Sequence, residues 1–139
     1  MGILVGIDVG ESRIGLSICN QEKKIAFPFT VLKRENNSYC FNKMKKVLEG
    51  RDVEAFVVGL PVRSDGEHGP ECEMVLKYVE SLEKNFSQEV ILWDERFTTV
   101  IAEKALLDVD MKREKRREVI DGIAAQILLQ SYLDSMNTN

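Results

Sequence analysis

The sequence predicts an α/β domain in which a mixed sheet is covered by helices. The first third of the chain contains three short apolar segments separated by turn residues, which is typical of an antiparallel meander. Later apolar segments alternate with helical patterns, and connections through helices make the strands they join parallel. The length of 139 residues suits a single domain spanning 1–139.

The meander is expected over residues 3–9, 13–19 and 24–32. The segments Gly-Glu-Ser and Asn-Gln-Glu separate these strands and supply the turns. In the second strand, Gly15 and Ser17 alternate with large apolar residues. The small residues share one side of the strand, so we expect that side to accept a close neighbour.

Helices and strands alternate after the meander. The expected elements are a helix over 38–49, a strand over 55–59, a helix from Pro70, a strand over 90–93, a helix from Thr98 or Thr99 to Leu107, and a final helix over 113–133. Ser38 is expected to cap the first helix, and Gly50 to end it. Proline is favoured at the first position of a helix, which places the second helix start at Pro70.

Composition narrows the classes of function. The net charge is −4, and no apolar segment is long enough to span a bilayer. Met1–Gly10 lacks the features of a signal peptide, which favours a cytoplasmic protein without membrane contact. The three cysteines form no C-x-x-C motif, so they are expected to be reduced. His68 is the only histidine and is read as a loop residue, so a histidine-based triad is not favoured.

Three acidic positions are expected to meet. Asp8 lies near the end of the first strand, Glu95 follows the last strand, and Asp121 interrupts the apolar stripe of the final helix. The carboxyl ends of parallel strands gather at one edge of a sheet, where active sites of α/β proteins lie. Asp94 is an alternative to Glu95, because either side chain at a strand end could point inward.

Asp121 shares a helical face with Ala124, Ala125 and Leu128, so it is expected where the helix packs rather than in water. A carboxylate there needs a partner. A salt bridge to Arg13 or Arg96 is one option, and a metal is the other.

Clustered carboxylates suit Mg²⁺ or Mn²⁺. Two such ions can activate water and stabilise the leaving oxygen during phosphodiester hydrolysis. A basic cluster precedes Asp121 and could hold a nucleic-acid backbone or form a solvated helix face; its members are Lys112, Arg113, Lys115, Arg116 and Arg117. Lys43, Lys45 and Lys46 form a smaller cluster with the same two interpretations.

These motifs, taken in order, resemble one family. The motifs are Gly6-x-Asp8-x-Gly10-x-x-Arg13-x-Gly15, Gly59-Leu60-Pro61 with Asp65-Gly66-x-x-Gly69, Asp94-Glu95-Arg96-x-Thr98-Thr99, and Lys115-Arg116 before Asp121-x-x-Ala124-Ala125-x-x-Leu128. Each motif alone is weak, but the ordered set is similar to the YqgF/RuvX family, which comprises RuvC-like proteins of the ribonuclease H superfamily.

The resemblance implies a ribonuclease H-like fold with a five-stranded mixed sheet flanked by helices. It implies a cytoplasmic, metal-dependent nuclease that matures the 5′ end of pre-16S rRNA, with a Holliday junction resolvase as the older description. Asp8, Glu95 and Asp121 fall on the family's catalytic and metal-binding acids. Arg13, Arg96, Thr98 and Thr99 fall on family positions that line the site. The basic cluster is our own expectation for substrate binding, through Lys112, Arg113, Lys115 and Arg116.

Two departures stand out. Cys19-Asn20 replaces a common Ser-Asp pair, which implies a changed turn, and Gly122 replaces a common Lys, which removes a contact to phosphate or a partner. Asp65 is read as a turn residue beside the site rather than as a ligand.

Several alternatives stay open. The Asp8-Val9-Gly10 turn also resembles the phosphate loop of actin-like ATPases, although those need two such domains. A non-catalytic nucleic-acid-binding or ribosome-associated module would use the acids structurally. A branched-DNA nuclease would favour a homodimer over a monomer. With no visible aromatic stacking platform, recognition of RNA or DNA is expected to depend on shape and backbone.

Overall fold

The computed structural model describes residues 2–62, 65–94 and 113–137, with 113–121 described by their helical backbone. The strands are β1 (Ile3–Val9), β2 (Arg13–Cys19), β3 (Ala26–Lys33), β4 (Val53–Leu60) and β5 (Glu89–Asp94). The helices are α1 (Asn37–Val47), α2 (Pro70–Asn85) and α4 (Arg113–Asn137). The predicted helix between Thr98 and Leu107 lies outside the described residues.

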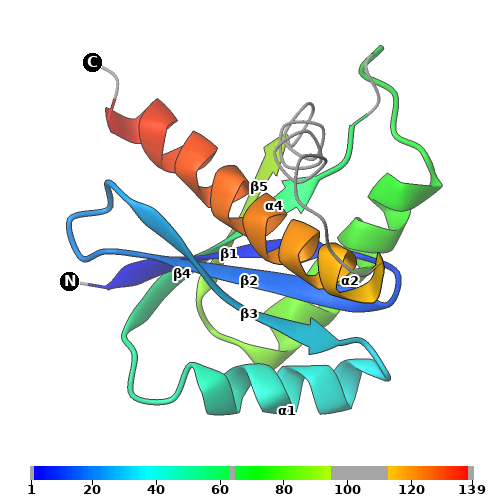
Figure 1. Ribbon diagram of the computed structural model, residues 1–139, viewed down its shortest axis with the longest axis horizontal. Coiled ribbons are helices and arrows are strands. Elements are labelled where there is room, and N and C mark those ends of the chain that lie inside the picture. Colours follow the sequence, from blue (N-terminus) through cyan, green and yellow to red (C-terminus); the bar gives the residue numbers. More distant parts are fainter. Residues whose placement is uncertain (1, 63–64, 95–112, 138–139) are drawn as a thin grey trace.

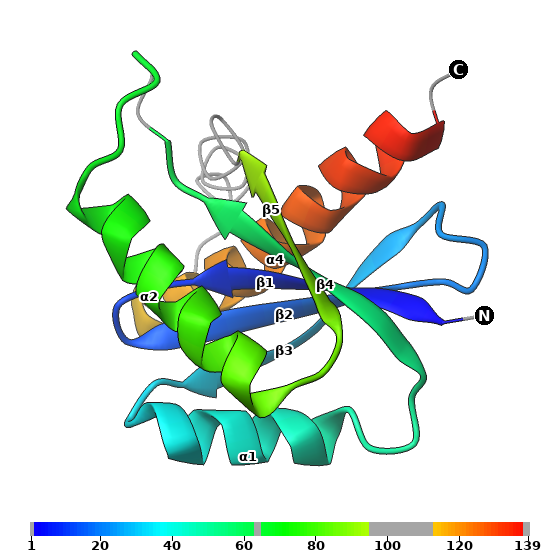
Figure 2. The same cartoon turned by 180° about the vertical axis from the view of Figure 1, so that it is seen from behind.

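The strands form one mixed sheet in the order β3-β2-β1-β4-β5. β1, β2 and β3 make the predicted antiparallel meander, and β4 runs parallel to both β1 and β5. Helix α4 crosses one face of the sheet, while α1 and α2 cover the other (Figures 1 and 2). The predicted α/β class and five-stranded mixed sheet are therefore confirmed.

The face under α1 and α2 holds the larger core. Val5, Ile7 and Val9 of β1 point into it and meet apolar residues of both helices. Its centre is aromatic: Phe41 lies 5.2 Å from Tyr78, and Phe56 lies 5.1 Å from Phe86, measured between ring centroids. Edge-to-face pairs such as Phe56 with Phe86 add to the free energy gained by burial.

The face under α4 is built from smaller residues. Its apolar cluster joins Leu4 of β1 to Leu129 and Leu133 of α4, together with Ala26 and Ala55. The Ser17 hydroxyl donates a hydrogen bond of 2.6 Å to the carbonyl oxygen of Ala125. The prediction that the side of β2 carrying Gly15 and Ser17 accepts a close neighbour is confirmed, and the neighbour is α4.

The predicted boundaries needed several corrections. Asn36, rather than Ser38, caps α1, because its side-chain oxygen accepts a hydrogen bond of 2.7 Å from the backbone N–H of Tyr39. Helix α1 ends at Val47, and Gly50 adopts a left-handed conformation (φ of 84°) two residues beyond the cap at Leu48. Pro70 begins α2 as predicted.

The ends of β5 and α4 also differ from prediction. Asp94 is the last residue of β5 instead of following it, because it pairs with Leu60 of β4. Helix α4 continues past Leu133 to Asn137, whose side-chain amide donates to the carbonyl oxygens of Leu133 and Lys23. Among the described helices, none is long and apolar enough to cross a lipid bilayer.

Candidate functional site

The candidate site lies at the edge of the sheet where β1, β4 and β5 end. These three strands are neighbours and parallel, so their carboxyl ends share that edge. Asp8 is the penultimate residue of β1, the central strand, and its side chain is half-buried. The expectation that the first strand and the Val90–Trp93 strand run parallel is therefore confirmed.

The alternation of β1 assigns Asp8 to the face covered by α4. Leu4 packs against Leu129 of α4, and a Cβ added to Gly6 would lie 2.9 Å from the Cβ of Leu129. Because successive side chains in a strand point to opposite faces, Asp8 shares the face of Leu4 and Gly6. The residue opposite Asp8 in β2 is Gly15, which adds no side chain next to the carboxylate.

Alternation along β5 places Asp94 on the opposite face of the sheet from Asp8. Trp93 of β5 faces α4, since its ring lies 5.3 Å from that of Tyr132 and its indole N–H donates to Ser131. Asp94 therefore points to the opposite face, where its partner Leu60 packs against the larger core. Glu95 lies outside the described residues.

Asp121 belongs to the backbone of α4, four residues before Ala125. Ala125 lies over the paired residues Gly6 and Ser17 of β1 and β2. The next position of the helix, Gly122, lies over Val31, which pairs with Gly15 in the row that contains Asp8. The predicted burial of Ala124, Ala125 and Leu128 on the sheet is confirmed; the side chain of Asp121 is not among those described.

Arg13 lies on the same face and at the same edge as Asp8. Its neighbours along β2 are Ile14, which points into the larger core, and Gly15, which faces α4. Arg13 pairs with Lys33 of β3, so both cations face α4. Sequence reasoning missed Lys33, because only the register of β3 brings it to this edge.

The turn after β1 is held in place by its own backbone hydrogen bond and by Arg34, the residue that follows β3. Gly10 donates a backbone hydrogen bond of 2.8 Å to Arg13, and a Cβ at Gly10 would lie 2.8 Å from the same oxygen. The Arg34 guanidinium donates to the Gly10 carbonyl and lies 5.4 Å from the centroid of the Tyr78 ring. Sequence reasoning missed Arg34 too, and the turn it fixes immediately follows the strand of Asp8.

The other predicted site residues are placed as follows. Arg113, Lys115 and Arg116 belong to the first turns of α4, where only their helical backbone is described. The remaining four, Arg96, Thr98, Thr99 and Lys112, lie outside the described residues. Within the part of the chain that the structure describes, no group of three or more His, Cys, Asp or Glu side chains could hold a metal ion.

Asp65, His68 and the cysteines take no part in this arrangement. The Asp65 carboxylate accepts a hydrogen bond from the backbone N–H of Glu67, which supports the turn interpretation, and His68 is exposed in its loop. All three cysteines are free, as predicted, and the structure buries each of them. Burial raises the pKa of Cys19 and of Cys40, so neither supplies a thiolate nucleophile at neutral pH.

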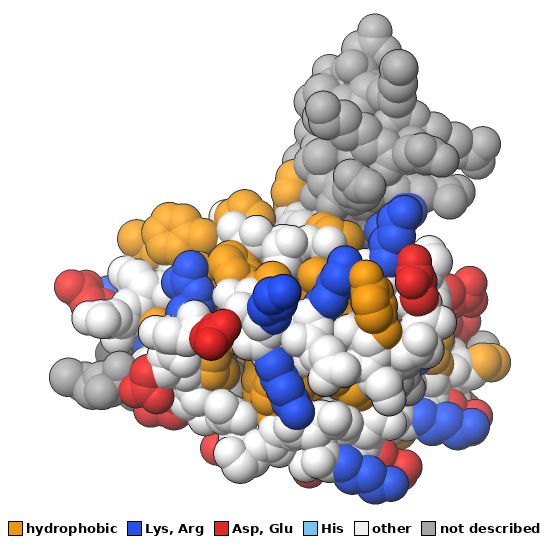
Figure 3. All heavy atoms as spheres, turned by 90° about the horizontal axis from the view of Figure 1, so that it is seen from below, with side chains coloured by type: hydrophobic (Ala, Val, Ile, Leu, Met, Phe, Trp, Pro, Cys, Tyr) orange, Lys and Arg blue, Asp and Glu red, His pale blue; other side chains and the backbone are white. Residues whose placement is uncertain are grey.

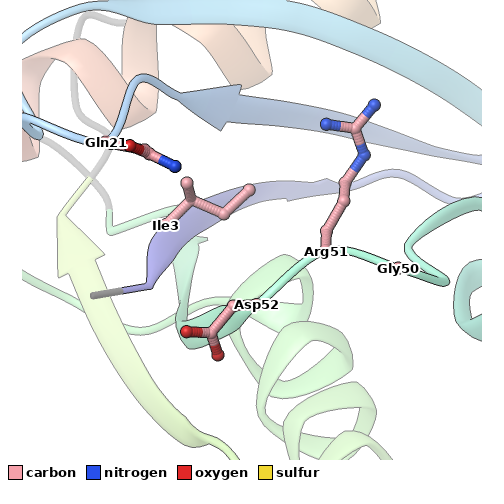
Figure 4. Close-up of a pocket in the computed structure, with 5 residues that line it drawn as sticks. All are labelled: Ile3, Gln21, Gly50, Arg51 and Asp52. Atoms are coloured by element: carbon pink, nitrogen blue, oxygen red, sulfur yellow. The ribbon is translucent and has the colours of Figure 1, made fainter.

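A hollow of about 380 Å³ lies at the opposite edge of the sheet. Its lining comes from the start of β1, the β2–β3 turn and the segment before β4: Ile3, Gln21, Gly50, Arg51 and Asp52 (Figure 4). Because β1 and β4 begin at this edge, the hollow is distant from the end of β1 where Asp8 lies. It is therefore separate from the candidate site.

The comparisons with known proteins address the family directly. The family model RuvX, described as Holliday junction resolvase, matches residues 2–135. The chain belongs to the RuvX family.

Curated relatives of this RuvX-family chain extend over nearly its full length. A protein of Thermoanaerobacter pseudethanolicus named "Putative pre-16S rRNA nuclease" is 42% identical over 133 residues, covering 95% of this chain and 96% of its own. A protein of Clostridium botulinum with the same name is 35% identical over 134 residues, covering 96% and 98%. The family and these relatives confirm the prediction of a nuclease.

Solved structures agree on the fold. RuvC of Thermus thermophilus, in complex with a Holliday junction substrate, superposes with a TM-score of 0.56 at 16% identity, covering 98% of this chain and 97% of that one. The fowlpox virus Holliday junction resolvase gives 0.56 at 14% identity, covering 96% and 99%. The predicted ribonuclease H-like, RuvC-like fold is thus confirmed.

Proposed function

We propose that this RuvX-family protein is a divalent-metal-dependent nuclease that cleaves a phosphodiester bond during maturation of the 5′ end of pre-16S rRNA. The observation that carries the proposal is the position of Asp8: a half-buried carboxylate at the carboxyl end of the central strand, on the face crossed by α4. The rRNA substrate comes from the names of the relatives.

In this proposal Asp8, Glu95 and Asp121 hold the metal. The alternation of β5 supports Glu95 over Asp94, because Asp94 shares its face with Leu60 rather than with Asp8. Asp121 is supported by its position in α4, one turn before Ala125 and next to Gly122, which lies over the row of Asp8. Each of the three acids is a hard oxygen ligand.

The donor chemistry fits Mg²⁺ or Mn²⁺, which prefer carboxylate oxygens. When bound, such an ion supplies an activated water and neutralises the charge that develops on the phosphate. Asp8 lies on a central strand that is hydrogen-bonded on both sides, so its main chain is held rigidly. A ligand on such an element keeps its geometry without reorganisation.

Cations beside the acids would bind the substrate backbone. Arg13 and Lys33 form one group at this edge of the sheet. Arg113, Lys115 and Arg116 begin α4, and Asp121 follows Arg113 by eight positions, roughly 12 Å along the axis. Phosphate contacts of this kind position a nucleic acid without reading its sequence. Arg96, Thr98, Thr99 and Lys112 complete the proposed substrate-binding set.

The decisive test replaces Asp8 by Asn, which keeps the shape and removes the charge. We expect cleavage of a pre-16S rRNA 5′-end fragment to fall by at least about 100-fold, because loss of groups that only support metal ligands already costs 10–100-fold. Gel assays with Mn²⁺ or Mg²⁺ measure the rate, and thermal unfolding checks that the variant folds.

Asp94→Asn is the matched control, because Asp94 is a neighbouring strand-end acid on the opposite face. It should keep cleavage near the wild-type rate, while Glu95→Gln should lose it. Undiminished cleavage by pure Asp8→Asn protein would refute the assignment, and loss of cleavage in Asp94→Asn alone would move the ligand from Glu95 to Asp94.

The family description favours one second candidate, cleavage of branched DNA. A four-way DNA junction in the same assay separates the two substrates. We propose the precursor rRNA as the faster substrate, with action in the cytoplasm and association with ribosomal particles. Sedimentation with and without the junction would show whether the protein works as a monomer or as a homodimer, which two symmetric cuts would favour.

A further inference from the structure

A second basic surface lies away from the candidate acids. It consists of Tyr39, Lys43 and Lys46 of α1, Arg51 after the helix, and Phe27 and Phe29 of β3, and we call it the α1–β3 face. Helix α1 itself carries three Lys and no Asp or Glu, and Arg51 follows it; Glu35, Glu49 and Asp52 lie before and after the helix. Figure 3 shows basic side chains gathered on the side of the molecule where α1 lies.

Two aromatic rings on this face are exposed to solvent. Phe27 is 45% exposed and Tyr39 is 41% exposed. The core of α1 does not use them, because Phe41 and Met44 on the opposite side of the helix already bury its apolar stripe. Both rings are therefore accessible to a ligand that stacks on aromatic side chains.

Cations lie directly against the aromatic rings. The Lys43 ammonium is 4.9 Å from the centroid of the Tyr39 ring, and the Arg51 guanidinium carbon is 4.9 Å from the centroid of the Phe29 ring. Each pair places a positive charge and a flat apolar surface at the same spot. This combination suits a ligand that carries both phosphates and unstacked bases.

The face also connects the two edges of the sheet. β3 is an outer strand and runs parallel to β1, so it ends at the edge where Asp8 lies. Helix α1 begins just after that end, and the chain then returns to the opposite edge at Arg51, which also lines the hollow of Figure 4. A strand lying on this face would therefore extend away from the candidate site.

We propose that the α1–β3 face binds a single-stranded segment of nucleic acid. Lys43, Lys46 and Arg51 contact its phosphates, while Tyr39 and Phe27 stack with its bases. Duplexes are disfavoured because their bases are already stacked and cannot reach the two rings. The segment is the flank of the strand that the proposed nuclease cleaves, so its biological role, although not its binding, rests on the proposed function.

Binding is measured without cleavage, by fluorescence anisotropy of the Asp8→Asn protein with a labelled single-stranded RNA of about 12 nucleotides in EDTA. The variant Lys43→Gln/Lys46→Gln removes two phosphate contacts. We expect the slope of log K against log salt concentration to become about 1.4 units shallower. The affinity should fall roughly 25-fold at 0.1 M salt. The matched control is Lys77→Gln/Lys84→Gln, two exposed lysines of α2, which should bind as the parent does.

The rings are tested separately from the charges. Tyr39→Leu removes the flat surface and should weaken binding by at least about fivefold, whereas Tyr39→Phe should keep it. A duplex of the same sequence should bind more weakly than the single strand. Equal affinity of the two double-lysine variants, or of Tyr39→Leu and Tyr39→Phe, would overturn the proposal, and so would a preference for the duplex. A protein-docking surface would produce those results.

Failure of this proposal is distinguishable from failure of the nuclease assignment. If Asp8→Asn cleaves normally while the lysine pair still controls binding, only the assignment of the acids is wrong. If Asp8→Asn loses cleavage but the lysine pair has no effect on binding, only the α1–β3 face is wrong.

Discussion

The two faces of the sheet are built in opposite ways. Under α1 and α2, large side chains fill the space, with Phe56 and Tyr78 at the centre. Under α4, small residues let the helix approach the strands, and the Ser17 hydroxyl bonds directly to the helix backbone. The first arrangement gains stability from buried volume, while the second fixes the position of α4 relative to the strand of Asp8. Stability and activity should therefore respond differently to changes on the two faces.

The largest effect is expected from Phe56→Ala on the volume-filled face. Phe56 is fully buried in β4, so the substitution leaves a cavity and should lower the free energy of unfolding by about 3–5 kcal/mol. Urea unfolding measures this loss. The folded fraction should still cleave at the wild-type rate, because Phe56 does not face α4. A loss of less than about 1 kcal/mol would show that this core is not the main source of stability.

Gly6→Ala tests the close-approach face. A Cβ at Gly6 would overlap the Ser17 hydroxyl oxygen and lie 2.9 Å from the Cβ of Leu129, so α4 has to move away. We expect a loss of about 1–3 kcal/mol in the free energy of unfolding. Cleavage should fall as well, unlike in Phe56→Ala, because Asp121 moves with the helix. A fully active Gly6→Ala protein would contradict the role given to this face.

The sequence predicted the strands better than it predicted their relations. Hydrophobic alternation and turn residues predicted both ends of β1 and of β2 correctly. The small residues Gly15 and Ser17, which share one side of β2, indicated where a neighbouring element would approach. It could not choose a cap for α1, because Asn36, Asn37 and Ser38 all carry suitable side-chain acceptors. In the structure Asn36 is the cap, because its side-chain oxygen accepts the hydrogen bond from Tyr39.

Register was the main missing information about the site. The acids near strand ends were predicted from hydrophobic runs alone, but whether Asp94 shares a face with Asp8 depends on the pairing of β4 with β5. Lys33 and Arg34 were missed for the same reason. Phe27 and Tyr39 suggested no stacking platform in the sequence, because they lie twelve residues apart on β3 and α1, two elements that come into contact only in the fold.

Tyr78→Phe sharpens the comparison on the volume-filled face. Among the described side chains, the buried Tyr78 hydroxyl has only the Cys40 thiol, a weak hydrogen-bonding group, beside it. Its removal should raise the free energy of unfolding by about 1–2 kcal/mol at pH 7, as measured in urea. Tyr39→Phe is the exposed control and should change stability little. A destabilised Tyr78→Phe protein would show that this hydroxyl makes a bond that the structure lacks.

The same substitution should alter the dependence of stability on pH. Burial raises the pKa of Tyr78, so above about pH 10 the unfolded chain loses a proton that the folded protein keeps. The unfolded state then binds fewer protons, and stability falls as pH rises. Tyr78→Phe removes this contribution, so its advantage over the wild type should grow between pH 9 and about pH 11. An advantage that stays constant would contradict the pKa shift.

The smallest effect is expected at Gly122, the second glycine at which α4 meets the sheet. A Cβ there would meet Val31 at 3.8 Å, which is ordinary van der Waals contact, so packing against the described residues does not require glycine. Alanine favours helix over glycine by about 0.8–1 kcal/mol, so Gly122→Ala should stabilise the protein by up to that amount in urea unfolding. Gly6→Ala and Gly122→Ala each add one methyl group where α4 meets the sheet. The first should lower the free energy of unfolding, and the second should raise it. Equal destabilisation by both would mean that α4 lies closer to β3 than its contact with Val31 indicates, and that the close approach extends over the whole helix rather than being concentrated at Gly6.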